Sequence, residues 1–367
     1  MLRMAPLISF IVLLTISAVA HATSSERLYY ASKGGYFQAA KNLIEANQAS
    51  TAYKNPNGET ALFAAAQTGR YDIAEYLLDN RANVNEPDNN RTYPLHLASQ
   101  ANNVPMVKLF LERGAYAGPV DFDGNTPVHH AARYGNMTML KLLLDKKAPA
   151  GHVNRDRVAP LHYAIRSGNN DMVQMLLEAG ADASALDRDN VSPLLIATKA
   201  GNVEMVKLLV KHKADIDPVG KEGVTPLHEA AAAGHFSIAQ TLLRKGASPK
   251  SKTIGGWVPL HHAARFGHVR IANMLLYSGS KINARTNEGK TIFDLATLAH
   301  QDDMLKFLKR YARKKGKRIP RTRKPVAAAI AQVKAGPKPA KPAAKSNASS
   351  LDALGIDMNA AAALLGL

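Results

Sequence analysis

The sequence contains few residues whose types and spacing could support catalysis. His228-Glu229 begins the His-Glu-x-x-His pattern of zinc proteases, but Ala232 stands where the second histidine is required. Gly289-Lys290-Thr291 matches the end of a phosphate-binding loop, but Ala284 replaces the glycine that the loop needs five residues earlier. Nucleophile-elbow and dinucleotide motifs are absent from the sequence. The sequence therefore predicts no catalytic residue and no cofactor.

Two pairs of adjacent histidines, His129-His130 and His261-His262, have the donor atoms of a metal site. The two pairs are separated by four copies of a 33-residue repeat. At roughly 8–10 Å per packed helix layer, this separation places them about 30–40 Å apart, so they cannot share one ion. We expect the first histidine of each pair to brace a turn through hydrogen bonds, and we expect no metal.

The elements that must position these residues are set by a motif that recurs eight times at 33-residue intervals. Its fullest copies are Thr225-Pro226-Leu227-His228-Glu229-Ala230 and Thr126-Pro127-Val128-His129-His130-Ala131. The weaker copies begin at Thr60, Tyr93, Ala159, Ser192, Val258 and Thr291. A 33-residue period with Thr-Pro-Leu-His-x-Ala predicts stacked helix pairs, which present a long surface to a partner.

Each unit contains signals for two helices. Thr followed by Pro favours the start of a helix, and a glycine nine residues later favours its end. Apolar residues follow 13 and 17 positions after the Thr, on one face of a second helix. A glycine usually ends this helix, but Arg81, Lys147 and Lys213 occupy the same position in three units. We expect these three residues to adopt a slightly strained left-handed conformation.

These units resemble ankyrin repeats, and the resemblance covers roughly residues 23–315. It implies an all-α solenoid of stacked helix-turn-helix units with β-hairpin fingers on one side. The predicted domains are a degenerate N-terminal capping repeat (23–59) and eight repeats of 33 residues (60–315). The resemblance also implies a protein-binding module with no catalytic or cofactor residues to assign. We expect the protein to be a monomer.

In the ankyrin family, the residue seven positions after the Thr faces a concave groove. Here those positions include Arg133, Arg166, Lys199 and Arg265, and none of them is acidic. We expect them to bind an acidic segment of a protein partner, because arginine and aromatic side chains dominate interface energetics. The further candidates in the groove are His130, Tyr134, Tyr163, His262 and Phe266. The alternative is a solvated face whose long side chains bind nothing.

Trp257 is the only tryptophan in the sequence and directly precedes a helix-opening position. A tryptophan on a projecting finger is a candidate binding residue. The alternative is that its ring folds against its own hairpin.

The N-terminus indicates export. Arg3 precedes an apolar run, and Ala20-His21-Ala22 fits a signal-peptidase site, so residues 1–22 are predicted to be a cleaved signal peptide. An uncleaved anchor is the alternative. The sequence contains no cysteine, which is compatible with an oxidising compartment. We therefore predict a periplasmic or secreted protein.

The C-terminal segment differs in composition from the repeats. The net charge is +18, and the run from Lys309 to Lys345 contains 14 Lys or Arg residues and no acid. Basic residues with alanine and proline predict a disordered tail over residues 316–367, which ends in a short apolar stretch. The tail would bind an anionic surface or polymer weakly, or would only prevent aggregation.

Together these features predict an exported, non-enzymatic protein-binding scaffold with no small-molecule substrate and no membrane span after signal cleavage. Two alternatives stay open: a secreted effector that binds a host protein, and a tail-led binder of anionic envelope polymer or nucleic acid.

Overall fold

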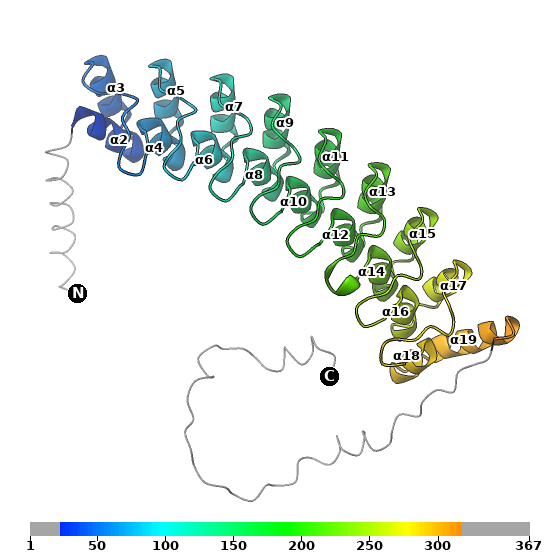
Figure 1. Ribbon diagram of the computed structural model, residues 1–367. Coiled ribbons are helices and arrows are strands. Elements are labelled where there is room, and N and C mark those ends of the chain that lie inside the picture. The colour runs from blue at the N-terminus through cyan, green and yellow to red at the C-terminus, as the bar shows by residue number, and fades with distance from the viewer. Residues whose placement is uncertain (1–22, 318–367) are drawn as a thin grey trace, which may run out of the picture. The chain divides into compact units, whose positions relative to one another are not determined.

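The computed structural model describes residues 23–317, which form a single row of 18 α-helices arranged as nine antiparallel pairs (Figure 1). The predicted signal peptide and all but the first two residues of the predicted tail lie outside these residues.

The first helix of each pair is called inner and the second outer. The inner helices are α2 (Ser24–Gly34), α4 (Ala61–Thr68), α6 (Pro94–Gln100), α8 (Pro127–Arg133), α10 (Pro160–Arg166), α12 (Pro193–Lys199), α14 (Pro226–Ala233), α16 (Pro259–Arg265) and α18 (Ile292–Leu298). The outer helices are α3 (Phe37–Glu45), α5 (Tyr71–Asp79), α7 (Val104–Glu112), α9 (Met137–Asp145), α11 (Asn170–Glu178), α13 (Val203–Lys211), α15 (Phe236–Arg244), α17 (Val269–Tyr277) and α19 (Asp302–Lys314).

The inner helices begin where the recurring motif predicts. The Thr60 hydroxyl accepts a hydrogen bond from the Phe63 amide at 3.1 Å, and Ser192 does the same for the Leu195 amide at 3.1 Å. Four outer helices (α7, α9, α11 and α13) begin with an asparagine that caps in the same way, as Asn202 does for the Met205 amide at 3.0 Å. Such caps satisfy backbone amides that have no partner within the helix.

The helices end in left-handed residues, as the glycine spacing predicts. Gly69 ends α4 with φ 72°, and Gly246 follows α15 with φ 97°. At the position of Gly246, three other repeats carry Arg81 (φ 66°), Lys147 (φ 60°) and Lys213 (φ 63°). The prediction of a left-handed backbone at these three residues is confirmed.

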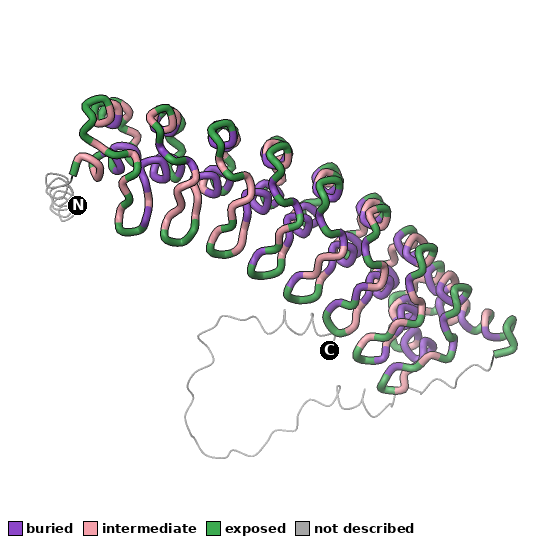
Figure 2. The backbone as a smooth tube through the Cα atoms, turned by 45° about the horizontal axis from the view of Figure 1, so that its top comes forward, coloured by how far each residue is buried: buried purple, intermediate pink, exposed green. Residues whose placement is uncertain are grey.

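The core is a continuous layer between inner and outer helices that extends along the whole row (Figure 2). The alanine of each inner helix, such as Ala131 or Ala230, is fully buried because neighbouring inner helices approach closely there. Met139, Met172 and Met205 are also fully buried, one in each successive outer helix. The methionine column is therefore packing between stacked helices.

A finger projects from the row between successive pairs, on the side of the inner helices (Figure 1). Each finger is a tight hydrogen-bonded turn, and no β-strand is assigned anywhere in residues 23–317; the only β feature there is an isolated bridge between Arg285 and Thr291. The expected β-hairpins are thus shorter than predicted, because each arm contributes only a few residues. Neighbouring finger tips bond to each other instead, as the Arg155 amide does to the Asp123 carbonyl at 2.9 Å. Across the same range, no helix is both long and apolar enough to cross a bilayer.

Candidate partner-binding groove

A ladder of buried histidines fixes the fingers to the inner helices. In His129, Nδ1 accepts a hydrogen bond from the Thr126 amide at 3.0 Å, so this nitrogen carries no proton. Nε2 must then carry the hydrogen of the neutral ring, and it donates to the Val158 carbonyl of the next finger at 3.1 Å. The same pair of bonds is made by His96, His162, His228 and His261. The bracing role expected for the first histidine of each pair is confirmed.

The second histidine of each pair lies beside the ladder and is uncharged. Burial lowers the pKa of His130 to about 4 and the pKa of His262 to about 3. Neither residue therefore contributes positive charge to the groove near neutral pH. Within residues 23–317, no three His, Asp or Glu side chains lie close enough together to hold a metal ion.

Three hollows lie in the angle between the inner helices and the fingers. We name them the polar hollow, the apolar hollow and the tryptophan hollow. Each is lined by the end of an inner helix and by residues of neighbouring fingers, so together they follow one face of the row. This face is the groove, and the residues predicted to face it are distributed among the hollows and their rims.

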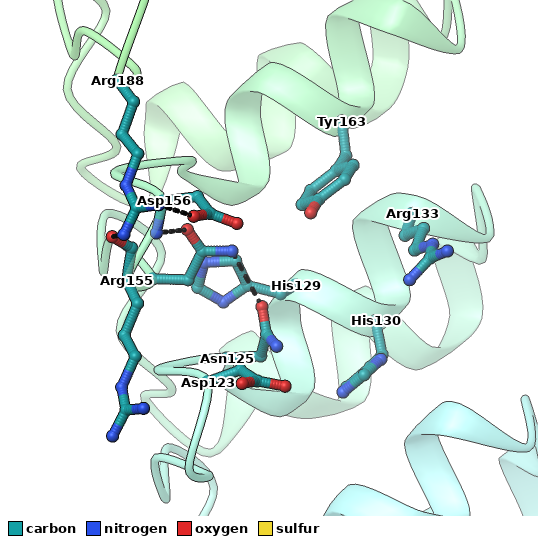
Figure 3. A pocket seen from close by; sticks show the side chains of 10 residues that line it. Asp123, Asn125, His129, His130, Arg133, Arg155, Asp156, Tyr163 and Arg188 are labelled. Carbon is teal, nitrogen blue, oxygen red and sulfur yellow. Dashed lines mark hydrogen bonds and ion pairs between the residues drawn. The ribbon is translucent and has the colours of Figure 1, made fainter. Parts of the chain in front are cut away.

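The polar hollow has a volume of about 440 Å³ and contains His130, Arg133 and Tyr163 of the predicted set (Figure 3). Its finger side is lined by Arg155 and Arg188. The Arg188 guanidinium is paired with the Asp156 carboxylate at 2.6 Å, and Arg155 lies over the Phe122 ring at 3.8 Å from its centroid. Arg133 is exposed and makes no ion pair with any described residue, so its charge is available to a ligand.

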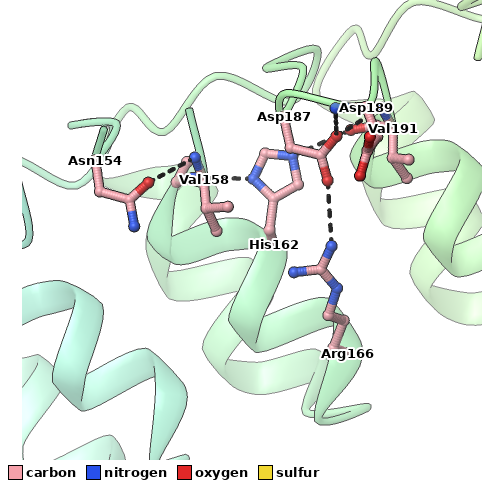
Figure 4. A network of polar contacts seen from close by, with 8 residues as sticks. Asn154, Val158, His162, Arg166, Asp187, Asp189 and Val191 are labelled. Carbon is pink, nitrogen blue, oxygen red and sulfur yellow. Dashed lines mark hydrogen bonds and ion pairs between the residues drawn. The ribbon is translucent and has the colours of Figure 1, made fainter. Parts of the chain in front are cut away.

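Arg166 differs from Arg133 because it is held by an acid of the next finger. Its Nη2 lies 3.2 Å from Oδ2 of Asp187, whose side chain is only 8% exposed (Figure 4). Oδ1 of Asp187 also accepts the amides of Asp189 at 3.0 Å and Val191 at 2.9 Å. Arg166 therefore compensates the charge of a buried turn residue, which was not expected from the sequence.

The apolar hollow has a volume of about 550 Å³ and lies between α10, α12 and α14. Its floor contains the buried side chains of Ile165 and Leu195. Lys199 of the predicted set lies at its edge together with Arg166, and neither Lys199 nor the neighbouring Lys221 is ion-paired within the described part of the chain. It is the least polar of the three hollows.

The tryptophan hollow has a volume of about 440 Å³ and contains Trp257, His262 and Arg265. The Trp257 ring is half-buried rather than projecting, with its centroid 5.0 Å from that of His262. It packs against the inner helix that follows its finger, so its indole forms a wall of the groove. The Arg265 guanidinium lies 5.8 Å from the Trp257 ring and 5.6 Å from the Phe266 ring.

The remaining predicted residues, Tyr134 and Phe266, follow the ends of α8 and α16 and are each 47% exposed. The structure thus places eight of the ten predicted residues in the lining of the three hollows, distributes them over several repeats, and does not form a single site. Many residues that line the hollows were not among the predicted set, and four of them bear on what the groove can bind. They are Arg155, Arg188, Leu195 and Lys221.

Of these four, Leu195 carries a signal in the sequence. It occupies the position of the ladder histidine in its repeat, and it interrupts an otherwise regular column from His96 to His261. The three basic residues lie in fingers, where the motif imposes no residue type, so no pattern distinguished them.

Comparison with protein families matches residues 28–121, 95–187 and 179–253 to the family described as ankyrin repeats (3 copies). Residues 255–287 match a single ankyrin repeat. The chain belongs to the ankyrin-repeat family. A comparison with curated proteins gives no match. Ankyrin repeats are typically non-enzymatic modules for protein–protein interaction, which agrees with a groove that extends over several repeats.

Proposed function

We propose that this ankyrin-repeat protein is an exported, non-enzymatic scaffold that docks an acidic segment of a protein partner along the groove. The observation that carries the proposal is the row of cations at the ends of the inner helices. Arg133, Lys199 and Arg265 occupy the same position in three repeats, are exposed, and have no acidic partner among the described residues. An acidic segment would neutralise cations that the fold itself does not pair.

Aromatic side chains add contact area beside these charges. Tyr134 and Phe266 are each about half exposed, and each directly follows one of the unpaired arginines. Trp257 supplies a further ring beside Arg265. Arginine, tyrosine and tryptophan are the residues that most often carry binding energy at interfaces. The groove therefore combines long-range attraction with surfaces that a partner can bury.

The sequence outside the described residues supports export and a second, weaker contact. Residues 1–22 have the composition of a signal peptide, which favours a periplasmic or secreted location. The basic tail would tether the protein to an anionic surface or polymer through charge alone. We propose that the protein acts as a monomer, because its exposed groove needs no second copy to be complete.

A crosslinking pull-down from the envelope fraction of the native cell tests the groove. The full chain and the double variant Arg133→Glu, Arg265→Glu are compared, because these arginines can be reversed without exposing a buried acid. Arg166 is unsuitable, since its reversal would leave Asp187 buried without its partner. The control is Lys141→Glu, which changes an exposed lysine on the outer helix α9.

We expect the groove variant to lose its crosslinked partner and the control to retain it. Equal capture by all three proteins would contradict the proposal. A chain truncated after residue 317 separates the groove from the tail. If that truncation alone abolished capture, and if capture by the full chain fell steeply with added salt, the tail-led alternative would be supported instead.

A further inference from the structure

The repeat that begins at Ser192 departs from its neighbours at two positions that normally fix the fingers. Leu195 stands where the neighbouring repeats carry His162 and His228. Gly220 stands at the start of the next finger, where the preceding finger has Asp187. Both changes remove a polar side chain from the same place, which is the contact between α12 and the finger that contains η1 (Lys221–Gly223).

The two changed residues contact each other in the structure. A Cβ atom at residue 220 would lie 2.9 Å from Cδ2 of Leu195, which is too close for any side chain without a shift. The finger therefore rests on leucine instead of being hydrogen-bonded to histidine. The Val224 carbonyl corresponds to the carbonyls that accept a ladder histidine elsewhere, and in the described residues it accepts only the Gly220 amide, at 2.9 Å.

The apolar hollow lies at this interruption of the ladder. Ile165 and Leu195 form its buried floor, while Val191, Ile196 and Val224 are half-buried around it. Its volume of about 550 Å³ lies within the range of small-ligand pockets. A histidine at residue 195 would place a polar ring in that floor, so the exchange of His for Leu is what makes the hollow apolar.

The rim of the apolar hollow is mainly basic. Lys199 and Lys221 are exposed and have no ion-pair partner in the part of the chain that the structure describes, whereas Arg166 is held by Asp187. One carboxylate, Glu229, also lines the hollow. An apolar floor beneath two available ammonium groups complements a ligand with an aliphatic group next to negative charge.

We propose that the apolar hollow is a specificity pocket that accepts an aliphatic side chain of the partner, with acidic residues on either side of it in the same peptide segment. The inference rests on the proposed function, because it selects one position in the groove and names what binds there. A peptide matches the hollow better than a nucleic acid does, since a phosphate backbone offers charge but no aliphatic side chain for the floor.

The test uses fluorescein-labelled pentapeptides and the full-length chain, with affinity measured by fluorescence anisotropy. One peptide is Asp-Glu-Leu-Glu-Asp and the other has serine in place of leucine. Both carry the same charge, so both bind the basic tail and the groove cations equally, and only the difference between their affinities reports the hollow. We expect the leucine peptide to bind about tenfold more tightly, as is usual for an aliphatic side chain in a matched pocket.

Two sets of variants locate the binding. Leu195→His restores the ladder histidine, with a donor for the Val224 carbonyl, so the fold is expected to keep its stability while the preference for leucine disappears. Lys199→Gln together with Lys221→Gln should weaken binding of the leucine peptide several-fold, whereas Lys211→Gln on the outer helix α13 should not. Circular dichroism confirms that each variant is folded.

Equal binding of the two peptides by the unaltered chain would overturn the inference, since the charge that both peptides carry would then explain binding without the hollow. A preference for leucine that survives in folded Leu195→His would overturn it as well. The proposed function is tested separately: if Arg133→Glu, Arg265→Glu still abolishes capture of the partner, the groove binds a protein even though this hollow does not select its side chain.

Discussion

The histidine ladder should make the ankyrin array sensitive to mild acid. Burial lowers the pKa of His129 and of His261 to about 4 from an ordinary value of 6.5. Between those values the unfolded chain binds a proton that the folded chain does not, so the free energy of unfolding falls as the pH falls from 6.5 towards 4. The loss is about 1.4 kcal/mol per pH unit for each histidine, or about 2 kcal/mol per histidine at pH 5.

One substitution isolates this effect from the titration of carboxylates. His129→Gln offers both a donor and an acceptor, but it lacks the ring geometry that bonds the Thr126 amide and the Val158 carbonyl at once. Losing one of these bonds costs about 1–3 kcal/mol at any pH. The substitution also removes the titrating ring. The variant should therefore be less stable than the parent at pH 7, and the difference should shrink by about 2 kcal/mol at pH 5.

Urea unfolding followed by far-UV circular dichroism measures both quantities. Parent, His129→Gln and the control His212→Gln, which replaces a histidine outside the ladder, are unfolded at pH 7, 6 and 5. A constant difference between parent and His129→Gln over this range would refute the reasoning. It would mean that the ring is accessible to protons in the folded array.

Two further predictions concern the stability of the repeats. Lys213→Gly should stabilise the protein by about 0.5–1 kcal/mol, because Lys213 has the left-handed φ of 63° that glycine adopts without strain. Gly246→Ala at the equivalent position, where φ is 97°, should destabilise the protein by at least a similar amount. Urea midpoints that move in the same direction in both variants would contradict this prediction. Leu209→Ala should cost about 2–5 kcal/mol, because Leu209 is fully buried between stacked helices. Thermal unfolding measures that loss, and a change below 1 kcal/mol would show that the stack collapses around the cavity.

Much of the fold could be predicted from the sequence because its signals are local. A capping residue such as Thr60 and a terminating glycine such as Gly69 act within a single helix, and repetition makes each signal visible several times. Even the left-handed conformation of Lys213 follows from its place in the repeat. The fingers were predicted less well, because the number of paired residues in a short turn depends on contacts with the neighbouring fingers.

The groove was predicted as a column of residues but not as a set of hollows. Its exposed arginines differ because of partners in the following finger, as Arg166 is paired with Asp187 while Arg133 is not. Trp257 was expected at a finger tip, yet its ring packs against His262 of the next inner helix. Such pairings join residues of different elements, and the identity of either residue alone does not specify them.

The central claim is that a partner protein docks in the groove between the inner helices and the fingers. Site-specific photocrosslinking tests it most directly, with benzoylphenylalanine placed at Tyr134 or Phe266 in the groove, and at Tyr277 on the outer helix α17, which is 64% exposed. We predict that the two groove positions crosslink one common protein and that the position on α17 does not. Crosslinking of that protein only from Tyr277, or equally from all three positions, would contradict the account.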